Sequence, residues 1–196
     1  MKEKDWISCQ KAATQLLLDQ PALSFPIEPQ QLKTKQDIYF DSFQGYCYTV
    51  NLPISSLCCH QIFHDGCTVF SSDPSFFLVL YNEWDFSKQR RRFTLAHELG
   101  HILLSHSMHD EYSETLANCF ASHLLIPRIA LNYLIEQAHS IRVREFSSFF
   151  GVSSSAIYAA YRNPSSCLFG QEELLCKLRP QLELFCRQLS EPIISV

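Results

Sequence analysis

The segment Arg92-Phe-Thr-Leu-Ala-His-Glu-Leu-Gly-His101 decides how this sequence folds. Its apolar residues recur at spacings of three and four, which predicts a helix from Ser87, as the N-cap, to about Ser105. Within that helix His97 and His101 are four residues apart. Because residues i and i+4 share one helical face, both imidazoles can bind a single metal ion.

Glu98 directly follows the first of these histidines and is turned about 100° round the helix from it. Its carboxylate is therefore expected beside the metal ion, where it can accept a proton from water without being a ligand. A bound metal lowers the pKa of water from about 16 to about 7, so a nucleophile is available at neutral pH. We predict that Glu98 is the general base of a hydrolytic site.

A zinc ion held by two histidines needs a third protein ligand and an open position for water. Glu114 follows His101 by 13 residues and lies in the next predicted helix, which covers about 112–125. A carboxylate from an antiparallel neighbouring helix would complete such a site. Asn118, one turn later, can bind the second ring nitrogen of a ligand histidine. Glu111 is the alternative third ligand.

Arg92–His101 is followed by Glu114-Thr-Leu-Ala-Asn-Cys-Phe-Ala121 and then by Leu124-Leu-Ile-Pro127. This succession resembles the ImmA/IrrE family of metallopeptidases, in which an (R)FTLAHELGH segment precedes E-x-x-A-(N/D)-x-F-A and LL-x-P segments. The resemblance covers about residues 10–165. It implies a zincin-type peptidase domain whose third ligand is the glutamate of the second segment, Glu114.

The resemblance also implies a function, because family members typically cleave a DNA-binding repressor of the helix-turn-helix type. We therefore expect a zinc-dependent endopeptidase, with Zn²⁺ as the metal and Mn²⁺ as the alternative. The second hypothesis is a regulatory protein that keeps the metal site and binds a repressor or another partner without cleaving it. The segment Cys47–Cys67 departs from the usual family pattern, which is a reason to expect a different choice of substrate.

The periodicity of the whole chain predicts an α+β fold, with a small sheet before the motif helix and helices after it. Strands are expected near residues 38–43, 46–50, 67–71 and 76–81. Further helices are expected over 5–20, 30–35, 128–139, 142–161 (as two short helices) and 171–189. We predict a peptidase domain over 1–127 and a C-terminal helical region over 128–196 that packs on it.

Several features allow more than one interpretation. The apolar run Phe76–Tyr81 is either an edge strand that pairs with an extended substrate or an interior strand. The basic run of Lys88, Arg90, Arg91 and Arg92 is expected to face solvent, and contact with a phosphate or an acidic peptide is the alternative. The tetrahedral oxyanion of a peptidase needs a hydrogen-bond donor, and the sequence does not choose among the candidates His106, His109, Tyr112, His123 and Tyr81.

Residues 142–161 resemble a helix-turn-helix with its turn at Phe150–Ser153. A DNA-reading helix presents polar or basic groups to the base edges, whereas the second helix here has no Lys or Arg before Arg162. The formal net charge of −4 also opposes a phosphate-driven approach. We predict two packed helices that support the peptidase domain or bind a protein partner, and no direct DNA binding.

The composition favours a cytoplasmic protein. The N-terminus lacks the apolar region of a signal peptide, and no segment has the roughly 20 apolar residues of a membrane span. Nine cysteines are therefore expected to be reduced and mostly buried. Cys58-Cys59-His60 with His64 and Cys67 does not have a recurrent zinc-site spacing. The sequence does not indicate an oligomeric state.

Overall fold

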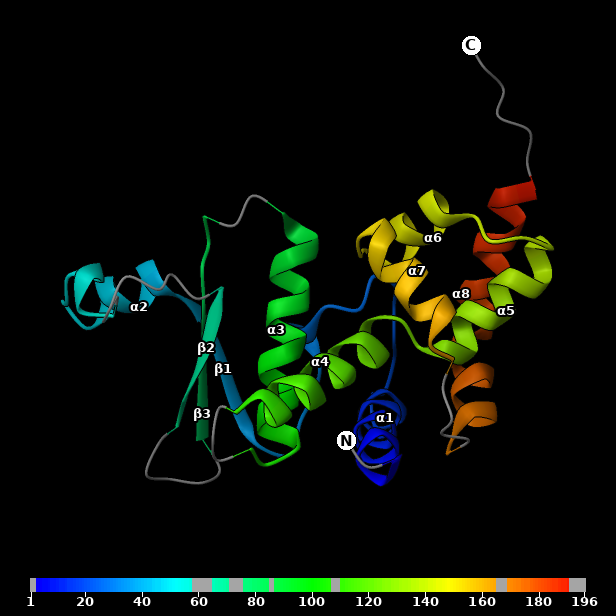
Figure 1. The fold of residues 1–196 in the computed structure, drawn as a ribbon. Helices are drawn as coiled ribbons and strands as arrows, with labels where there is room; N and C mark the ends of the chain where they lie inside the picture. Colours follow the sequence, from blue (N-terminus) through cyan, green and yellow to red (C-terminus); the bar gives the residue numbers. More distant parts are fainter. Residues whose placement is uncertain are drawn as a thin grey trace, which may run out of the picture. The chain divides into compact units, whose positions relative to one another are not determined.

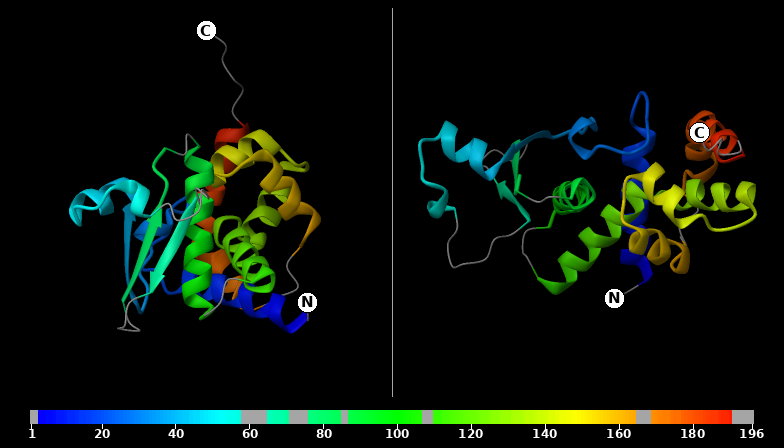
Figure 2. Two further views of the ribbon diagram at one scale, coloured as in Figure 1. Left: turned by 60° about the vertical axis from the view of Figure 1, so that its left-hand side comes forward. Right: turned by 90° about the horizontal axis from the view of Figure 1, so that it is seen from above.

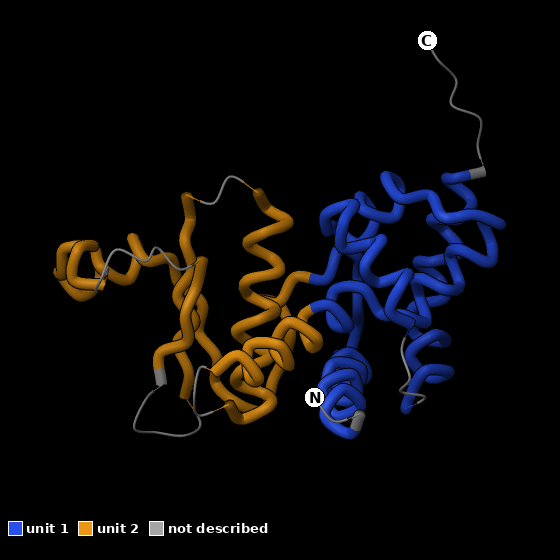
Figure 3. The backbone as a smooth tube through the Cα atoms, in the orientation of Figure 1, with its two compact units in different colours: residues 1–27, 122–196 blue, residues 28–121 orange. Residues whose placement is uncertain are grey.

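The computed structural model describes residues 3–57, 65–70, 76–84, 87–106, 110–164 and 169–190. These residues form eight α-helices, two short 3₁₀-helices and one three-stranded sheet (Figure 1). The predicted α+β class is therefore confirmed. The chain divides into two compact units (Figure 3): residues 28–121 contain the sheet, and residues 1–27 together with 122–196 contain most of the helices.

The sheet lies in the unit 28–121 and has the strand order β1-β3-β2. β1 (Asp37–Ser42) runs parallel to β3 (Phe76–Tyr81), and β2 (Gly66–Phe70) runs antiparallel to β3. Because β3 pairs on both sides, it is an interior strand, and the interpretation of this segment as an edge strand is wrong. β2 forms one edge of the described sheet.

α3 (Lys88–Leu103) lies along one face of this sheet, as both views in Figure 2 show. It begins at Ser87, whose hydroxyl accepts a backbone N–H from the first turn, so the predicted N-cap is confirmed. On the buried side of α3, Leu95 and Ile102 pack with Val79 of β3. Alternate residues of the strands complete this cluster, namely Ile38, Phe40, Phe77 and Tyr81.

Two cations of the basic run at the start of α3 form ion pairs within the protein. Arg90 forms an ion pair with Asp65 at 2.6 Å, and Arg92 forms one with Glu28. The expectation that the whole run faces solvent is wrong for Arg92, which is buried. Its partner Glu28 lies 64 residues away in the sequence, and the Glu28 carboxylate compensates the positive charge of the guanidinium. Pairing of this kind allows an arginine to be buried.

The segment after β1 is a helix and not the predicted strand. α2 (Phe43–Thr49) begins because the Ser42 hydroxyl accepts the Gly45 N–H at 2.9 Å, which caps its first turn. The aromatic residues here suggested a strand, but the cap starts a helix directly at the end of β1. α2 lies on the side of the sheet away from α3 (Figures 1 and 2). The 3₁₀-helices η1 (Pro29–Gln31) and η2 (Ile54–Ser56) are the remaining short elements of this unit.

In the other unit α1 (Glu3–Leu18) packs with α8 (Gln171–Ser190) and α8 with α5 (Arg128–Ala138). The Lys177 ammonium of α8 donates to the carbonyls of Leu17, Leu18 and Gln20 at the end of α1. These bonds explain why the N-terminal helix groups with the C-terminal helices, a division that differs from the predicted boundary at residue 127. Packing of the helical region on the peptidase domain stays a prediction.

α6 (Val143–Phe150) and α7 (Ser154–Arg162) form the predicted pair of short helices. Gly151 between them has a φ of 64°, a left-handed conformation that glycine adopts without strain. The Ser153 hydroxyl then caps α7 by accepting the N–H of Ala156. None of the described helices is long and apolar enough to cross a membrane.

Candidate metal centre

Two helices supply the candidate site, and the residues they contribute to it lie in the unit 28–121. α4 (Glu111–Leu125) packs against α3 at Gly100. A Cβ added to Gly100 would lie 3.1 Å from the Cα of Ala117 and 3.1 Å from the ring of Phe120. The glycine of the His-Glu-Leu-Gly-His motif therefore permits the close approach that brings α4 beside the two histidines.

A reciprocal pair of hydrogen bonds fixes the first turn of α4. The Ser113 N–H donates to the Asp110 carboxylate at 2.7 Å, and the Asp110 N–H donates to the Ser113 hydroxyl at 3.0 Å. The backbone N–H and then the hydroxyl of Ser113 hold the pKa of Asp110 below its usual value. Glu114 follows directly, so this cap sets the position from which its side chain reaches α3.

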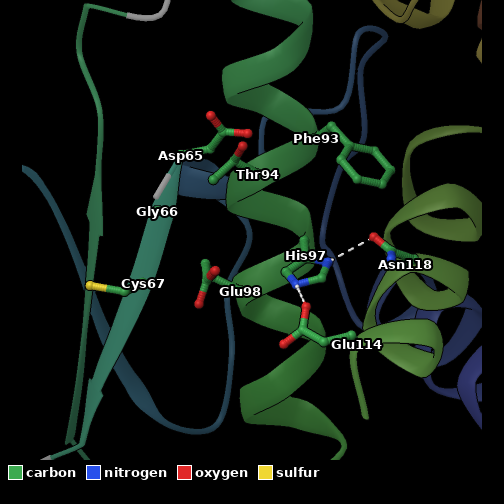
Figure 4. Close-up of a pocket in the computed structure, with 9 residues that line it drawn as sticks. All are labelled: Asp65, Gly66, Cys67, Phe93, Thr94, His97, Glu98, Glu114 and Asn118. Atoms are coloured by element: carbon green, nitrogen blue, oxygen red, sulfur yellow. Dashed lines mark hydrogen bonds and ion pairs between the residues drawn. The ribbon is translucent and has the colours of Figure 1, made fainter. Parts of the chain in front are cut away.

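The side chains of His97, His101 and Glu114 converge. Figure 4 shows the side chains of His97 and Glu114 pointing toward one another. The two Nε2 atoms of the histidines lie 3.0 Å apart. The Glu114 carboxylate places Oε2 3.1 Å from Nε2 of His97 and Oε1 3.3 Å from Nε2 of His101. Exposure increases from one side chain to the next: that of His101 is 1% exposed, that of His97 15% and that of Glu114 43%.

The spacing and chemistry of these donors fit a divalent metal ion. Ligand atoms about 2.0–2.1 Å from a tetrahedral zinc ion lie about 3.4 Å from one another, close to the separations of 3.0, 3.1 and 3.3 Å observed here. Two imidazoles and one carboxylate form a donor set that zinc uses in catalytic sites. These residues can therefore hold a divalent metal ion.

Each histidine is also held at its second ring nitrogen. Nδ1 of His97 lies 2.9 Å from Oδ1 of Asn118, and Nδ1 of His101 lies 3.2 Å from Nδ1 of His106. If Nε2 binds a metal, the proton must sit on Nδ1, so His97 donates to Asn118 and His101 donates to His106. The contact of Asn118 was expected from its spacing, whereas that of His106 was not.

Glu98 lies beside this group but is turned toward the sheet (Figure 4). Its carboxylate is buried and accepts a hydrogen bond from the Thr68 hydroxyl of β2 at 2.7 Å. A pocket of about 630 Å³ opens at the site. Its wall is formed by Asp65, Gly66, Cys67, Phe93, Thr94, His97, Glu98, Glu114 and Asn118.

The candidates for oxyanion stabilisation that lie in the described part of the chain do not line this wall. Tyr81 packs in the core cluster with its ring 5.6 Å from the Arg91 guanidinium, and Tyr112 is exposed on α4. His106 faces the ring of His101, and His123 belongs to the other unit. The remaining oxyanion candidate, His109, lies outside the described ranges, and so do Cys58, Cys59, His60 and His64, whose spacing did not indicate a zinc site. The oxyanion donor therefore stays a prediction.

Residues 68–161 match the model of a peptidase family described as the IrrE N-terminal-like domain. Over this segment the chain is similar to that family. The match extends from Thr68 through both helices of the site and includes all three candidate ligands. The resemblance to ImmA/IrrE metallopeptidases is confirmed, and with it a peptidase-type function. No curated protein matches the chain closely enough to count as a relative.

Asn118→Ala is expected to weaken Zn²⁺ binding by this peptidase about 10–100-fold, because the His97 ring loses the acceptor that fixes its orientation. Affinity is measured by competition with a chelator of known strength. Asn118→Asp is the matched control, since it keeps an acceptor oxygen at the same position and should bind as tightly as the parent. Equal weakening in both variants would show that the contact at 2.9 Å does not orient His97.

The reactivity of the Cys67 thiol reports on the electrostatic environment of the pocket. Burial, with a further effect of the Glu98 carboxylate, raises the pKa of its thiol to about 11. Only the thiolate reacts with iodoacetamide, so modification of Cys67 in the metal-free protein should be very slow at pH 7 and rise about tenfold per pH unit toward pH 11. Cys176, which is exposed, should react before Cys67. Residue-by-residue mass spectrometry checks this order, and rapid modification of Cys67 at pH 7 in the folded protein would contradict it.

Proposed function

We propose that this protein is a zinc-dependent endopeptidase that cleaves another protein, with a helix-turn-helix transcriptional repressor as its substrate. The observation that carries the proposal is the convergence of His97, His101 and Glu114 next to the buried carboxylate of Glu98. The first three residues account for a metal site, and Glu98 accounts for a base beside it. An HExxH helix lying against a small sheet, with a glutamate as third ligand, supports a zincin-like domain of the gluzincin type.

The proposed chemistry divides between the metal and Glu98. A bound divalent ion would polarise a peptide carbonyl and acidify water in the pocket. Glu98 accepts a proton from the attacking water and later donates it to the nitrogen of the leaving amine. His97, His101 and Glu114 hold the metal, while Asn118 and His106 keep the two imidazoles in the orientation and tautomer that this requires.

The presence of a base favours cleavage over the alternative of a metal-containing protein that only binds its partner. A structural metal site is closed by four protein ligands and has no need of a neighbouring carboxylate. Here the described residues supply three candidate ligands, an adjacent glutamate and an accessible pocket. This combination supports a site that admits a peptide and water.

The repressor substrate rests on the family resemblance in the sequence, and a cytoplasmic location is part of the same proposal. We do not propose direct DNA binding, because Arg162 is the only cation of α7. The other exposed residues of this helix include Ser154, Ser155, Tyr158 and Tyr161. We therefore propose that the protein meets its repressor as a protein partner and does not first read an operator sequence.

Incubation with purified repressors tests the proposal, beginning with any repressor encoded beside this gene. With Zn²⁺ or Mn²⁺ present, gel electrophoresis and mass spectrometry should show cleavage at one peptide bond, which a chelator abolishes and added metal restores. Cleavage that continues after the metal is removed would contradict a metal-dependent mechanism. A panel of repressors that all stay intact would contradict the proposed substrate class.

A further inference from the structure

We propose that Thr68 is a positioning residue for the general base, and that its hydroxyl determines which oxygen of Glu98 accepts the proton. This inference rests on the proposed function, since it needs Glu98 to act as the base. Thr68 lies at the centre of β2, paired with Val79 of β3, and its side chain is buried at 8% exposure. No spacing in the sequence connects it with Glu98, which is 30 residues away.

The approach of β2 to α3 brings the two side chains together. Gly66 lies two residues before Thr68 and therefore on the same face of the strand. A Cβ at Gly66 would lie 2.6 Å from the side chain of Thr94 and 3.7 Å from Cγ of Glu98. Because β2 passes this close to the helix, the short side chain of Thr68 reaches the Glu98 carboxylate without an intervening water.

The direction of the hydrogen bond follows from its chemistry. An ionised carboxylate can only accept, so the Thr68 hydroxyl donates its proton to Oε2 of Glu98 at 2.7 Å. A hydrogen bond to a charged acceptor is stronger than a neutral one and fixes the plane of the carboxylate. It also makes Oε2 the less basic oxygen, so Oε1 becomes the atom that takes the proton from water. Threonine suits this role because its β-branched side chain has a restricted χ1.

The alternative explanation is that the hydroxyl only satisfies a buried polar group. Thr68→Val and Thr68→Ser distinguish the two. Valine keeps the shape and suits a strand but cannot donate, so kcat should fall about 10–100-fold with KM and metal content unchanged. Serine keeps the hydroxyl and should stay within about threefold of the parent. Thr49→Val, which removes a hydroxyl bonded to the Gly45 carbonyl at 3.0 Å in α2, is the matched control and should leave kcat unchanged.

Proton NMR of the metal-free protein gives a readout independent of cleavage. The Thr68 hydroxyl proton should exchange slowly and give its own signal, which Glu98→Ala removes. The proposal is overturned if this signal is absent from the parent, if Thr68→Val keeps the parental kcat, or if Thr68→Ser is as impaired as Thr68→Val. Failure of the proposed function looks different: the parent then cleaves no repressor, or Glu98→Gln cleaves as fast as the parent. In that case the role of Thr68 is overturned as well.

Discussion

Glu98→Gln is expected to lower the rate of repressor cleavage by at least about 10²–10⁴-fold, the usual contribution of general base catalysis. The substitution keeps the size of the side chain and an oxygen that can accept the Thr68 hydroxyl, but the amide cannot take a proton from water. Glu98 is also the proposed proton donor to the leaving amine, so both halves of the reaction lose their catalyst. The effect should appear in kcat, because the carboxylate is not proposed to bind the substrate.

Glu98→Gln also separates the two functional hypotheses. The donor atoms of His97, His101 and Glu114 are untouched, so metal content and folding should match those of the parent. The variant should still bind the repressor and retain it as a complex that survives gel filtration. If cells carrying Glu98→Gln relieve repression as well as the parent does, binding without cleavage is the function.

The motif helix and its candidate ligands could be predicted because their signals are local. An i, i+4 pair of histidines, a serine N-cap and a glutamate in the first turn of the next helix all lie between Ser87 and Glu114. The structure has these helices at Lys88–Leu103 and Glu111–Leu125, within a residue or two of the prediction. The site follows because Gly100, itself part of the motif, allows the two helices to approach.

The features that sequence reasoning missed depend on pairing between distant residues. Nothing near Thr68 indicates that β2 passes over Glu98, and nothing near Arg92 indicates its pairing with Glu28. The order β1-β3-β2 was also inaccessible, because the pattern of an apolar strand does not show whether one or both of its edges are paired. The helix at Phe43 could have been predicted from its N-cap, because the Ser42 side chain accepts the N–H three residues later. The aromatic residues that follow favoured a strand instead.

Replacement of either candidate histidine ligand is expected to have an equally large effect on the metal content of the purified protein. The purified parent should contain about one divalent ion per chain, with zinc favoured because two ligands are imidazoles. His97→Ala and His101→Ala should each abolish metal retention through gel filtration, measured by elemental analysis. His101 is almost fully buried, so circular dichroism must accompany its variant to show that the loss is not caused by unfolding. If both variants keep the metal, these histidines are not the ligands.

The third ligand is tested by two glutamates of the same helix turn. Glu114→Ala removes the carboxylate whose oxygens lie 3.1 and 3.3 Å from the two histidine Nε2 atoms, and should weaken metal binding far more than Glu111→Ala. Both substitutions remove one negative charge near the N-terminus of α4, so the favourable interaction with the helix dipole is lost in each and cancels from the comparison. The two variants then differ in whether the lost carboxylate is a ligand of the metal. If Glu111→Ala proves the more damaging, Glu111 is the ligand and the convergence of Glu114 with the histidines has another cause.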